Sequence, residues 1–202
     1  MQIIGVTGGV GCGKSCVLDY LEEKYSAYVL KADELAGQLR EPGGSCYEPL
    51  IALLGEGILD PETGRIDKAR MAQRIFSDRA LLQKVNDLMH PMVREEILRR
   101  IGEKRNDTAC RLFVLEAALL LEEGYDSVTD QMWYIHADEA VRRKRLKAAR
   151  GYSDEKITSI MQKQLPEEEF RRRCDTVIDN SGDIGQTRQQ IDAALGALTE
   201  RR

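Results

Sequence analysis

Residues 8–15 read GGVGCGKS, and they decide the fold class that the sequence predicts. The stretch satisfies the spacing G-x-x-x-x-G-K-[ST], with its matching positions at Gly8, Gly13, Lys14 and Ser15. In loops of this pattern, backbone N–H groups surround phosphate oxygens, and glycine allows the close approach that this requires. The lysine reaches the β- and γ-phosphates of a nucleoside triphosphate, and the hydroxyl binds Mg²⁺. The sequence therefore predicts a triphosphate-binding loop, with an incidental glycine-rich turn as the alternative.

The loop lies between an expected strand and an expected helix, as its phosphate-binding role requires. Residues Gln2–Thr7 (QIIGVT) form an apolar run that is typical of a buried strand. Residues 14–24 carry apolar side chains at helical spacing, and residues 27–30 suit a second strand. The order strand, helix, strand indicates a parallel sheet with right-handed crossovers.

A long helical stretch interrupts the pattern of strands. Residues 33–105 contain no strand signal and are too long for one crossover helix, so we expect a helical insertion beside the sheet. Helices are expected within it at residues 67–76 and 78–103. Further strands are expected at residues 111–115, 131–136 and 176–179, and further helices at residues 138–150 and 183–198.

Composition narrows the possible partners. The chain has 202 residues, 42% of them hydrophobic, and a net charge of −4, which argues against general affinity for nucleic acid. No apolar run approaches the roughly 18 residues that suggest a membrane span. The five cysteines are scattered without metal-type spacing, so we expect free thiols and a cytoplasmic protein with neither nucleic-acid nor membrane partners. The sequence carries no signal for an oligomeric state.

Two further features distinguish among triphosphate-binding proteins. None of the three asparagines is followed by lysine, so the guanine-specifying Asn-Lys-x-Asp motif is missing and a Ras-like GTPase is disfavoured. Asp33 follows the second expected strand, and the carboxyl ends of parallel strands line the ligand crevice in open sheets. Asp33 is therefore either a base for a hydroxyl that attacks the γ-phosphate or a helix N-cap.

Seven segments along the chain carry a more specific signal. They are TGGVGCGKS (7–15), KADELAGQLREPGG (31–44), LMHPMVREEI (88–97), ALLLEEGYD (118–126), ARGYSDEKI (149–157), QLPEEEF (164–170) and VIDNSGD (177–183). In this order they resemble dephospho-CoA kinases, and the resemblance covers nearly the whole chain. It implies that ATP phosphorylates the ribose 3′-hydroxyl of dephospho-CoA, the last step of coenzyme A biosynthesis.

The resemblance also implies a fold and a division of the chain. The expected fold is an α/β P-loop three-layer architecture with a five-stranded parallel sheet, a helical acceptor-binding insertion and a helical lid. The expected core comprises residues 1–32, 108–138 and 174–202. The insertion would take residues 33–107, and the lid would take residues 139–173.

Site residues carry over from the family position by position. The resemblance implies an ATP-binding stretch at Gly11, Cys12, Gly13, Lys14, Ser15 and Cys16, with Asn180 beside the adenine. Turn chemistry alone also explains Asn180. Asp33, Lys14 and Arg145 are the expected catalytic residues, and Arg145 would contact the triphosphate from the lid. The alternative for Arg145 is a charged, exposed helix face.

Acceptor and metal residues complete the expected site. The resemblance implies that Asp33, His90 and Arg94 bind dephospho-CoA, although His90 also suits a core or capping position and Arg94 a solvated surface. Mg²⁺ would be bound by Ser15 and, through water, by Glu116.

Several positions depart from the family pattern. Lys31 replaces an aspartate two residues before Asp33, and the segment after Glu116 lacks the usual proline. Cys12 and Cys16 are atypical loop residues. A helix N-terminus lowers a thiol's pKa, which predicts a reactive Cys12 protected by ATP. The alternative is that Cys12 is simply a small residue that a tight loop tolerates. These departures leave open a regulatory nucleotide-binding protein with impaired catalysis. A kinase of a nucleoside or another small alcohol also stays open, because acceptor specificity lies in the helical insertion.

Overall fold

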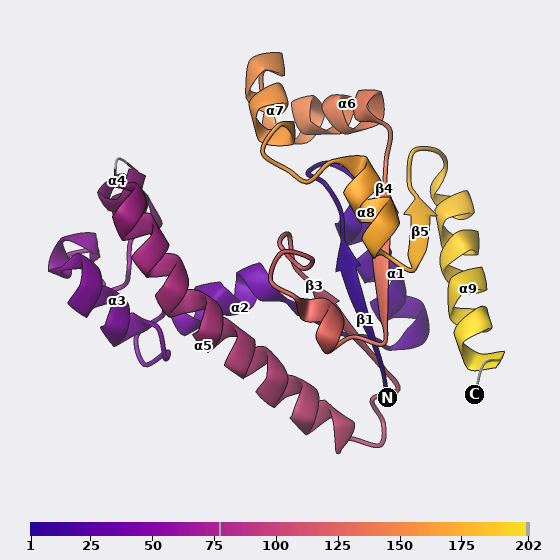
Figure 1. The fold of residues 1–202 in the computed structure, drawn as a ribbon, viewed down its shortest axis with the longest axis horizontal. Helices are drawn as coiled ribbons and strands as arrows, with labels where there is room; N and C mark the ends of the chain where they lie inside the picture. Colours follow the sequence, from indigo (N-terminus) through magenta and orange to yellow (C-terminus); the bar gives the residue numbers. More distant parts are fainter. Residues whose placement is uncertain (77, 201–202) are drawn as a thin grey trace. The chain divides into compact units, whose positions relative to one another are not determined.

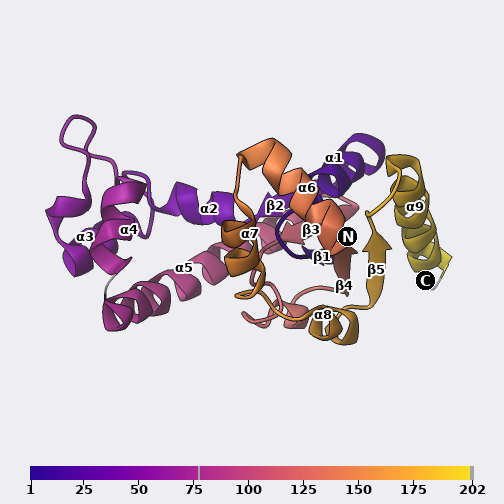
Figure 2. The same ribbon diagram turned by 90° about the horizontal axis from the view of Figure 1, so that it is seen from above.

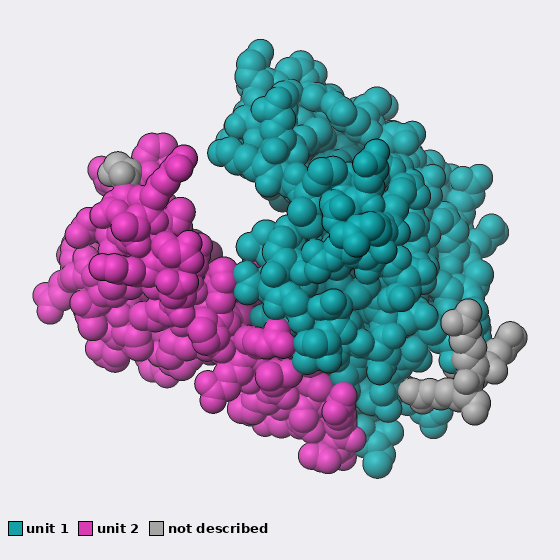
Figure 3. Space-filling model, in the orientation of Figure 1, with its two compact units in different colours: residues 1–30, 107–202 teal, residues 31–106 magenta. Residues whose placement is uncertain are grey.

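The computed structural model describes residues 1–76 and 78–200, which divide into two compact units (Figures 1 and 3). One unit joins residues 1–30 to residues 107–202, and the other comprises residues 31–106. Around the sheet the elements are β1 (Gln2–Thr7), α1 (Lys14–Tyr25), β2 (Tyr28–Lys31), β3 (Leu112–Glu116), β4 (Gln131–His136), α6 (Glu139–Arg150), α7 (Asp154–Met161), α8 (Glu167–Arg173), β5 (Thr176–Asp179) and α9 (Ile184–Glu200). The second unit contains α2 (Ala32–Leu39), α3 (Tyr47–Leu54), α4 (Lys68–Phe76) and α5 (Arg79–Arg105). Short 3₁₀ turns occupy Glu56–Ile58 and Tyr125–Ser127.

The five strands form one parallel sheet in the order β2-β3-β1-β4-β5. The central strand β1 pairs in parallel with both β3 and β4, and its Val6 lies opposite Glu116 on β3. The register therefore brings Glu116 to the level of the last residues of β1, where the glycine-rich loop begins. Every residue of β1 from Ile3 to Thr7 is buried, as expected for the central strand of a parallel sheet covered on both faces.

Side chains alternate along β4 and divide the helices between the two faces of the sheet. Trp133 and Ile135 belong to the buried cluster that α1 and α9 complete, with Val17 and Leu18 of α1 among its members. Tyr134, which points the other way, stacks on Phe170 of α8 with ring centroids 4.8 Å apart. Helices α1 and α9 thus cover one face and α8 covers the other (Figure 2).

The unit of residues 31–106 is helical and has a core of its own. Its longest element is α5, whose first turn is capped by the Asp78 carboxylate accepting from the Leu81 N–H at 2.9 Å. Helix α5 continues through Pro91 and buries apolar residues at helical spacing. The core cluster of this unit includes Leu50, Ile58 and Met71.

The fold class predicted from the sequence is confirmed, and the expected strands agree with the observed ones to within a residue or two. The roles expected for the insertion and for residues 139–173 stay predictions, and residues 139–173 belong to the same compact unit as the sheet. None of the helices in residues 1–76 and 78–200 is both long and apolar enough to cross a bilayer.

Candidate active site

The glycine-rich loop joins β1 directly to α1, and its shape depends on glycine. Gly8, Gly11 and Gly13 have φ values of +153°, +79° and +88°, a region that side chains disfavour. A Cβ atom on Gly8 would lie 2.5 Å from the carbonyl oxygen of Ile135, so β4 also restricts this position. The loop ends at the N-terminus of α1, where free N–H groups and the helix dipole favour anions.

A cation and a carboxylate face each other beside this loop. The Lys14 Nζ donates to the Gly8 carbonyl oxygen at 2.9 Å and lies 3.6 Å from Glu116 Oε1. Both side chains are largely buried, at 18% and 13% exposure. The neighbouring Ser15 is exposed on the first turn of α1.

The ammonium, the carboxylate and the hydroxyl beside the loop suit a triphosphate with Mg²⁺. In the described part of the chain, no three His, Cys, Asp or Glu side chains gather as metal ligands. A site with a hydroxyl and one nearby carboxylate suits Mg²⁺, which usually keeps several waters and takes oxygens from substrate phosphates. Ser15 and Glu116 are the residues that would hold it.

Asn180, expected beside the adenine, is buried against the loop and forms hydrogen bonds with three segments. Its Nδ2 donates to the Cys12 carbonyl oxygen at 2.8 Å, and its Oδ1 accepts from the Thr187 hydroxyl at 3.1 Å. Its backbone N–H donates to the His136 carbonyl oxygen at 2.8 Å. A Cβ atom on Gly13 would collide with the Asn180 Nδ2. Asn180 therefore braces the end of the loop, and its contact with adenine stays a prediction.

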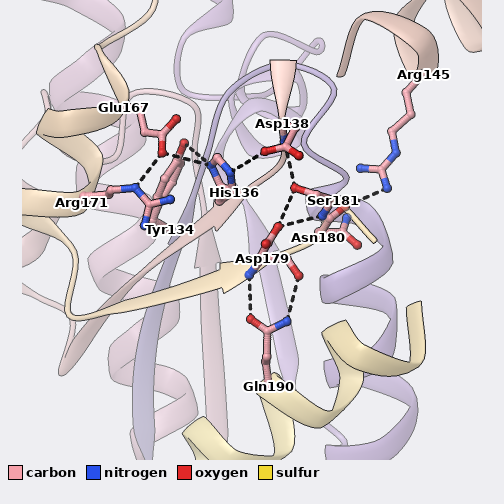
Figure 4. Close-up of polar contacts among 10 residues, drawn as sticks. All are labelled: Tyr134, His136, Asp138, Arg145, Glu167, Arg171, Asp179, Asn180, Ser181 and Gln190. Carbon is pink, nitrogen blue, oxygen red and sulfur yellow. Dashed lines mark hydrogen bonds and ion pairs between the residues drawn. The ribbon is translucent and has the colours of Figure 1, made fainter. Parts of the chain in front are cut away.

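Arg145 reaches the same point from α6. Its Nη1 donates to the Cys12 carbonyl oxygen at 3.2 Å, and its Nη2 donates to the Asn180 carbonyl oxygen at 2.9 Å (Figure 4). The side chain is half-buried, so the alternative of a solvated helix face is wrong for Arg145. Arg150 at the end of α6 is exposed, with its guanidinium carbon 5.9 Å from the Tyr152 ring centroid.

A polar cluster at the ends of β4 and β5 adjoins these residues. His136 is 8% exposed, and its ring nitrogens lie 3.4 Å from Asp138 and 3.5 Å from Glu167 (Figure 4). The Ser181 hydroxyl and N–H both donate to Asp179 and hold the pKa of that carboxyl below its usual range. Sequence reasoning missed this cluster, because histidine in a strand gives no signal for partners that are distant in sequence.

The lowered pKa predicted for the Cys12 thiol is wrong. Cys12 is 2% exposed, and burial raises its pKa even though the positive charge of Lys14 acts in the opposite direction. A thiol that is both buried and protonated reacts slowly. Cys16, by contrast, is exposed on the first turn of α1.

We therefore expect brief treatment with N-ethylmaleimide to label Cys16 well before Cys12. Trypsin cuts after Lys14 and separates the two cysteines, so mass spectrometry of the peptides measures each rate. The Cys16→Ser variant is the control and should lose the fast-labelled peptide. Faster labelling of Cys12 in the wild type would contradict this expectation.

The expected acceptor residues all belong to the unit of residues 31–106. Asp33 is exposed in the first turn of α2, and Lys31, not Asp33, occupies the N-cap position. The N-cap alternative for Asp33 is therefore wrong. The Lys31 Nζ donates to Glu34 at 3.1 Å, so the Glu34 carboxylate partly neutralises the charge of this ammonium.

His90 and Arg94 lie one turn apart in the middle of α5, and both are half-buried. The capping alternative for His90 is wrong, because α5 extends eleven residues before it and fifteen beyond it. Their contact with an acceptor stays a prediction.

Comparisons with known proteins identify the family of the chain. A family model described as dephospho-CoA kinase matches residues 2–186. A dephospho-CoA kinase from Aquifex aeolicus (strain VF5) is 38% identical over 199 residues, covering 98% of each chain. One from Carboxydothermus hydrogenoformans is 37% identical over 191 residues, covering 95% of this chain and 91% of the relative.

Solved structures support the fold. A protein from Thermus thermophilus superposes with a TM-score of 0.81 at 30% identity, covering 98% of this chain and 97% of that one. A dephospho-CoA kinase from Campylobacter jejuni shares the fold with a TM-score of 0.73 at 20% identity, over 99% of this chain and 98% of that one. With a family model matched over most of its length and full-length relatives above 30% identity, this chain belongs to the dephospho-CoA kinase family.

Proposed function

We propose that the chain transfers the γ-phosphate of ATP to the ribose 3′-hydroxyl of dephospho-CoA. The observation that carries this proposal is the loop at the end of β1, with the Lys14 ammonium 3.6 Å from Glu116 at the carboxyl end of β3. A positively charged, glycine-lined loop at a helix N-terminus is suited to hold the donor phosphates. Family membership supplies the acceptor.

On the donor side, the loop residues Gly11, Cys12, Gly13, Lys14, Ser15 and Cys16 would surround the triphosphate. Lys14 would place its ammonium against the β- and γ-phosphates, and Ser15 and Glu116 would hold Mg²⁺. When bound, Mg²⁺ neutralises phosphate charge and fixes the orientation of the phosphates. The 3.6 Å between Lys14 Nζ and Glu116 Oε1 supports a role for both side chains at the same phosphates.

On the acceptor side, we assign Asp33 as the group that takes the proton of the 3′-hydroxyl. Its carboxylate is exposed, and α2 begins at the residue after β2 ends. Residues that follow the carboxyl end of a parallel strand line the ligand crevice in such folds. His90 and Arg94 of α5 would bind the acceptor, and a guanidinium suits a phosphate group.

Arg145 is proposed to stabilise charge that develops on the transferred phosphoryl group. Its guanidinium is fixed by two backbone carbonyl oxygens, one from the loop and one from Asn180. A preorganised cation stabilises a transition state at little reorganisation cost.

We place the reaction in the cytoplasm, because all five cysteines are free thiols.

An acceptor panel tests this proposal. Pure protein is incubated with Mg·ATP and either dephospho-CoA or a set of nucleosides, and mass spectrometry follows the gain of one phosphate. We expect the product with dephospho-CoA alone. Product with nucleosides but not with dephospho-CoA would favour a kinase of another small alcohol. Tight ATP binding without any transfer would favour a regulatory protein.

A further inference from the structure

The outer turn of the glycine-rich loop is held by a closed ring of three hydrogen bonds. Arg142 Nε donates to the Val10 carbonyl oxygen at 2.9 Å, and the Val10 N–H donates to Gln164 Oε1 at 3.2 Å. Arg142 Nη2 donates to the same Gln164 oxygen at 2.8 Å, which closes the ring. The N–H and the carbonyl oxygen of Val10 are therefore both hydrogen-bonded to side chains that are far away in the sequence.

The two side chains come from different parts of residues 139–173. Arg142 lies in the first turn of α6, and Gln164 lies between α7 and α8. Both are half-buried. Gln164 thus connects the stretch after α7 to the first turn of α6, beside the loop.

Gly9 of the loop lies close to this ring. A Cβ atom on Gly9 would lie 2.7 Å from Arg142 Cζ and 3.0 Å from Gln164 Oε1. Gly9 has no positive φ, so backbone conformation does not require glycine there. A side chain at this position would instead have to displace the ends of the Arg142 and Gln164 side chains from the ring.

The hydrogen-bond acceptor in the ring is a neutral amide oxygen. The Gln164 oxygen accepts two hydrogen bonds, one of them from a guanidinium, and it does so without a negative charge. A carboxylate would satisfy the same donors but would add an anion beside a loop that is suited to bind phosphates. A neutral side chain therefore preserves the positive field of the loop.

We propose that Gln164 is a positioning residue for ATP, which acts through Arg142 and the Val10 N–H to hold the loop in its phosphate-binding shape. This inference deepens the proposed function and rests on it. Gln164 takes no direct part in the phosphoryl transfer. Its effect is on the affinity for the donor, because a loop that is already ordered loses less entropy on binding.

Replacing Gln164 with alanine in the full chain tests the proposal. We expect KM for ATP and the dissociation constant for ADP to rise about tenfold, from the loss of two hydrogen bonds, while KM for dephospho-CoA changes less than about twofold. Hydrogen–deuterium exchange of residues 8–14 should speed up in the protein alone. Gln162→Ala, an exposed glutamine two residues earlier, is the matched control and should match wild type.

Two further variants keep the test decisive. Arg142→Ala combined with Gln164→Ala should weaken ADP binding no more than the stronger single variant, because both residues serve one ring. Gln164→Glu retains the acceptor and the fold, and its KM for ATP should rise at low salt and recover as KCl is added.

Unchanged ADP affinity and loop exchange in Gln164→Ala, or an equal rise in KM for both substrates, would overturn the proposal. Additive losses in the double variant would also overturn it. ADP affinity and exchange need no phosphoryl transfer, so they decide this inference even if dephospho-CoA proves not to be the acceptor.

Discussion

Replacing Asp33 with asparagine is expected to lower kcat by about 10²–10⁴-fold while ADP affinity stays nearly unchanged. The amide keeps the size of the side chain but cannot take the proton of the attacking hydroxyl. Because Lys31 occupies the N-cap position of α2, removal of the Asp33 charge does not remove a cap from this helix. Steady-state turnover with ATP and dephospho-CoA, together with calorimetry with ADP, measures both quantities.

The neighbouring carboxylate provides a matched control for Asp33. Glu34 lies in the same turn of α2, is exposed, and pairs with Lys31 at 3.1 Å. Glu34→Gln should keep turnover within about threefold of wild type, since an exposed ion pair contributes little. Wild-type turnover in Asp33→Asn, or equal losses in the two variants, would remove Asp33 from the mechanism.

The second large effect is expected at Lys14. Lys14→Met keeps a long unbranched side chain but removes the ammonium, and kcat/KM for ATP should fall about 10²–10³-fold because a preorganised positive charge is lost. The substitution also removes the ammonium that lies 3.6 Å from the largely buried Glu116 carboxylate, so less of that carboxylate's repulsion against phosphate is offset.

Lys24→Met on the same helix is the control for Lys14. Its ammonium is half exposed and pairs with Asp192 at 2.7 Å, away from the loop. Activity of this variant should stay within about twofold of wild type. A Lys14→Met protein that keeps its kcat/KM within about threefold would contradict the role assigned to Lys14.

The local elements of the fold were predictable because their signals are local. Apolar periodicity located β1, α1 and β4, and the positions of glycine, lysine and serine located the loop between the first two. The strand order β2-β3-β1-β4-β5 was not predicted, because it depends on pairing between residues more than one hundred positions apart, such as Val6 and Glu116. The apolar periodicity of one strand does not show which other strand lies next to it in the sheet.

The candidate site was predictable where a motif specifies chemistry. Lys14 and Glu116 were both predicted, and the structure brings them together. The pKa of Cys12 was predicted in the wrong direction, because helix position is visible in the sequence but burial against β4 is not. Gln164 was missed for the same reason: a single glutamine before Leu165 and Pro166 does not reveal that it meets Val10.

Phosphorus NMR of the reaction with Mg·ATP and dephospho-CoA is the most direct test of the central claim, because it identifies the hydroxyl that receives the phosphate. We predict a new phosphomonoester signal coupled to the ribose 3′-proton, appearing in a one-to-one ratio with ADP. Formation of ADP with inorganic phosphate alone, or a phosphomonoester coupled to a different proton, would contradict phosphoryl transfer to the 3′-hydroxyl.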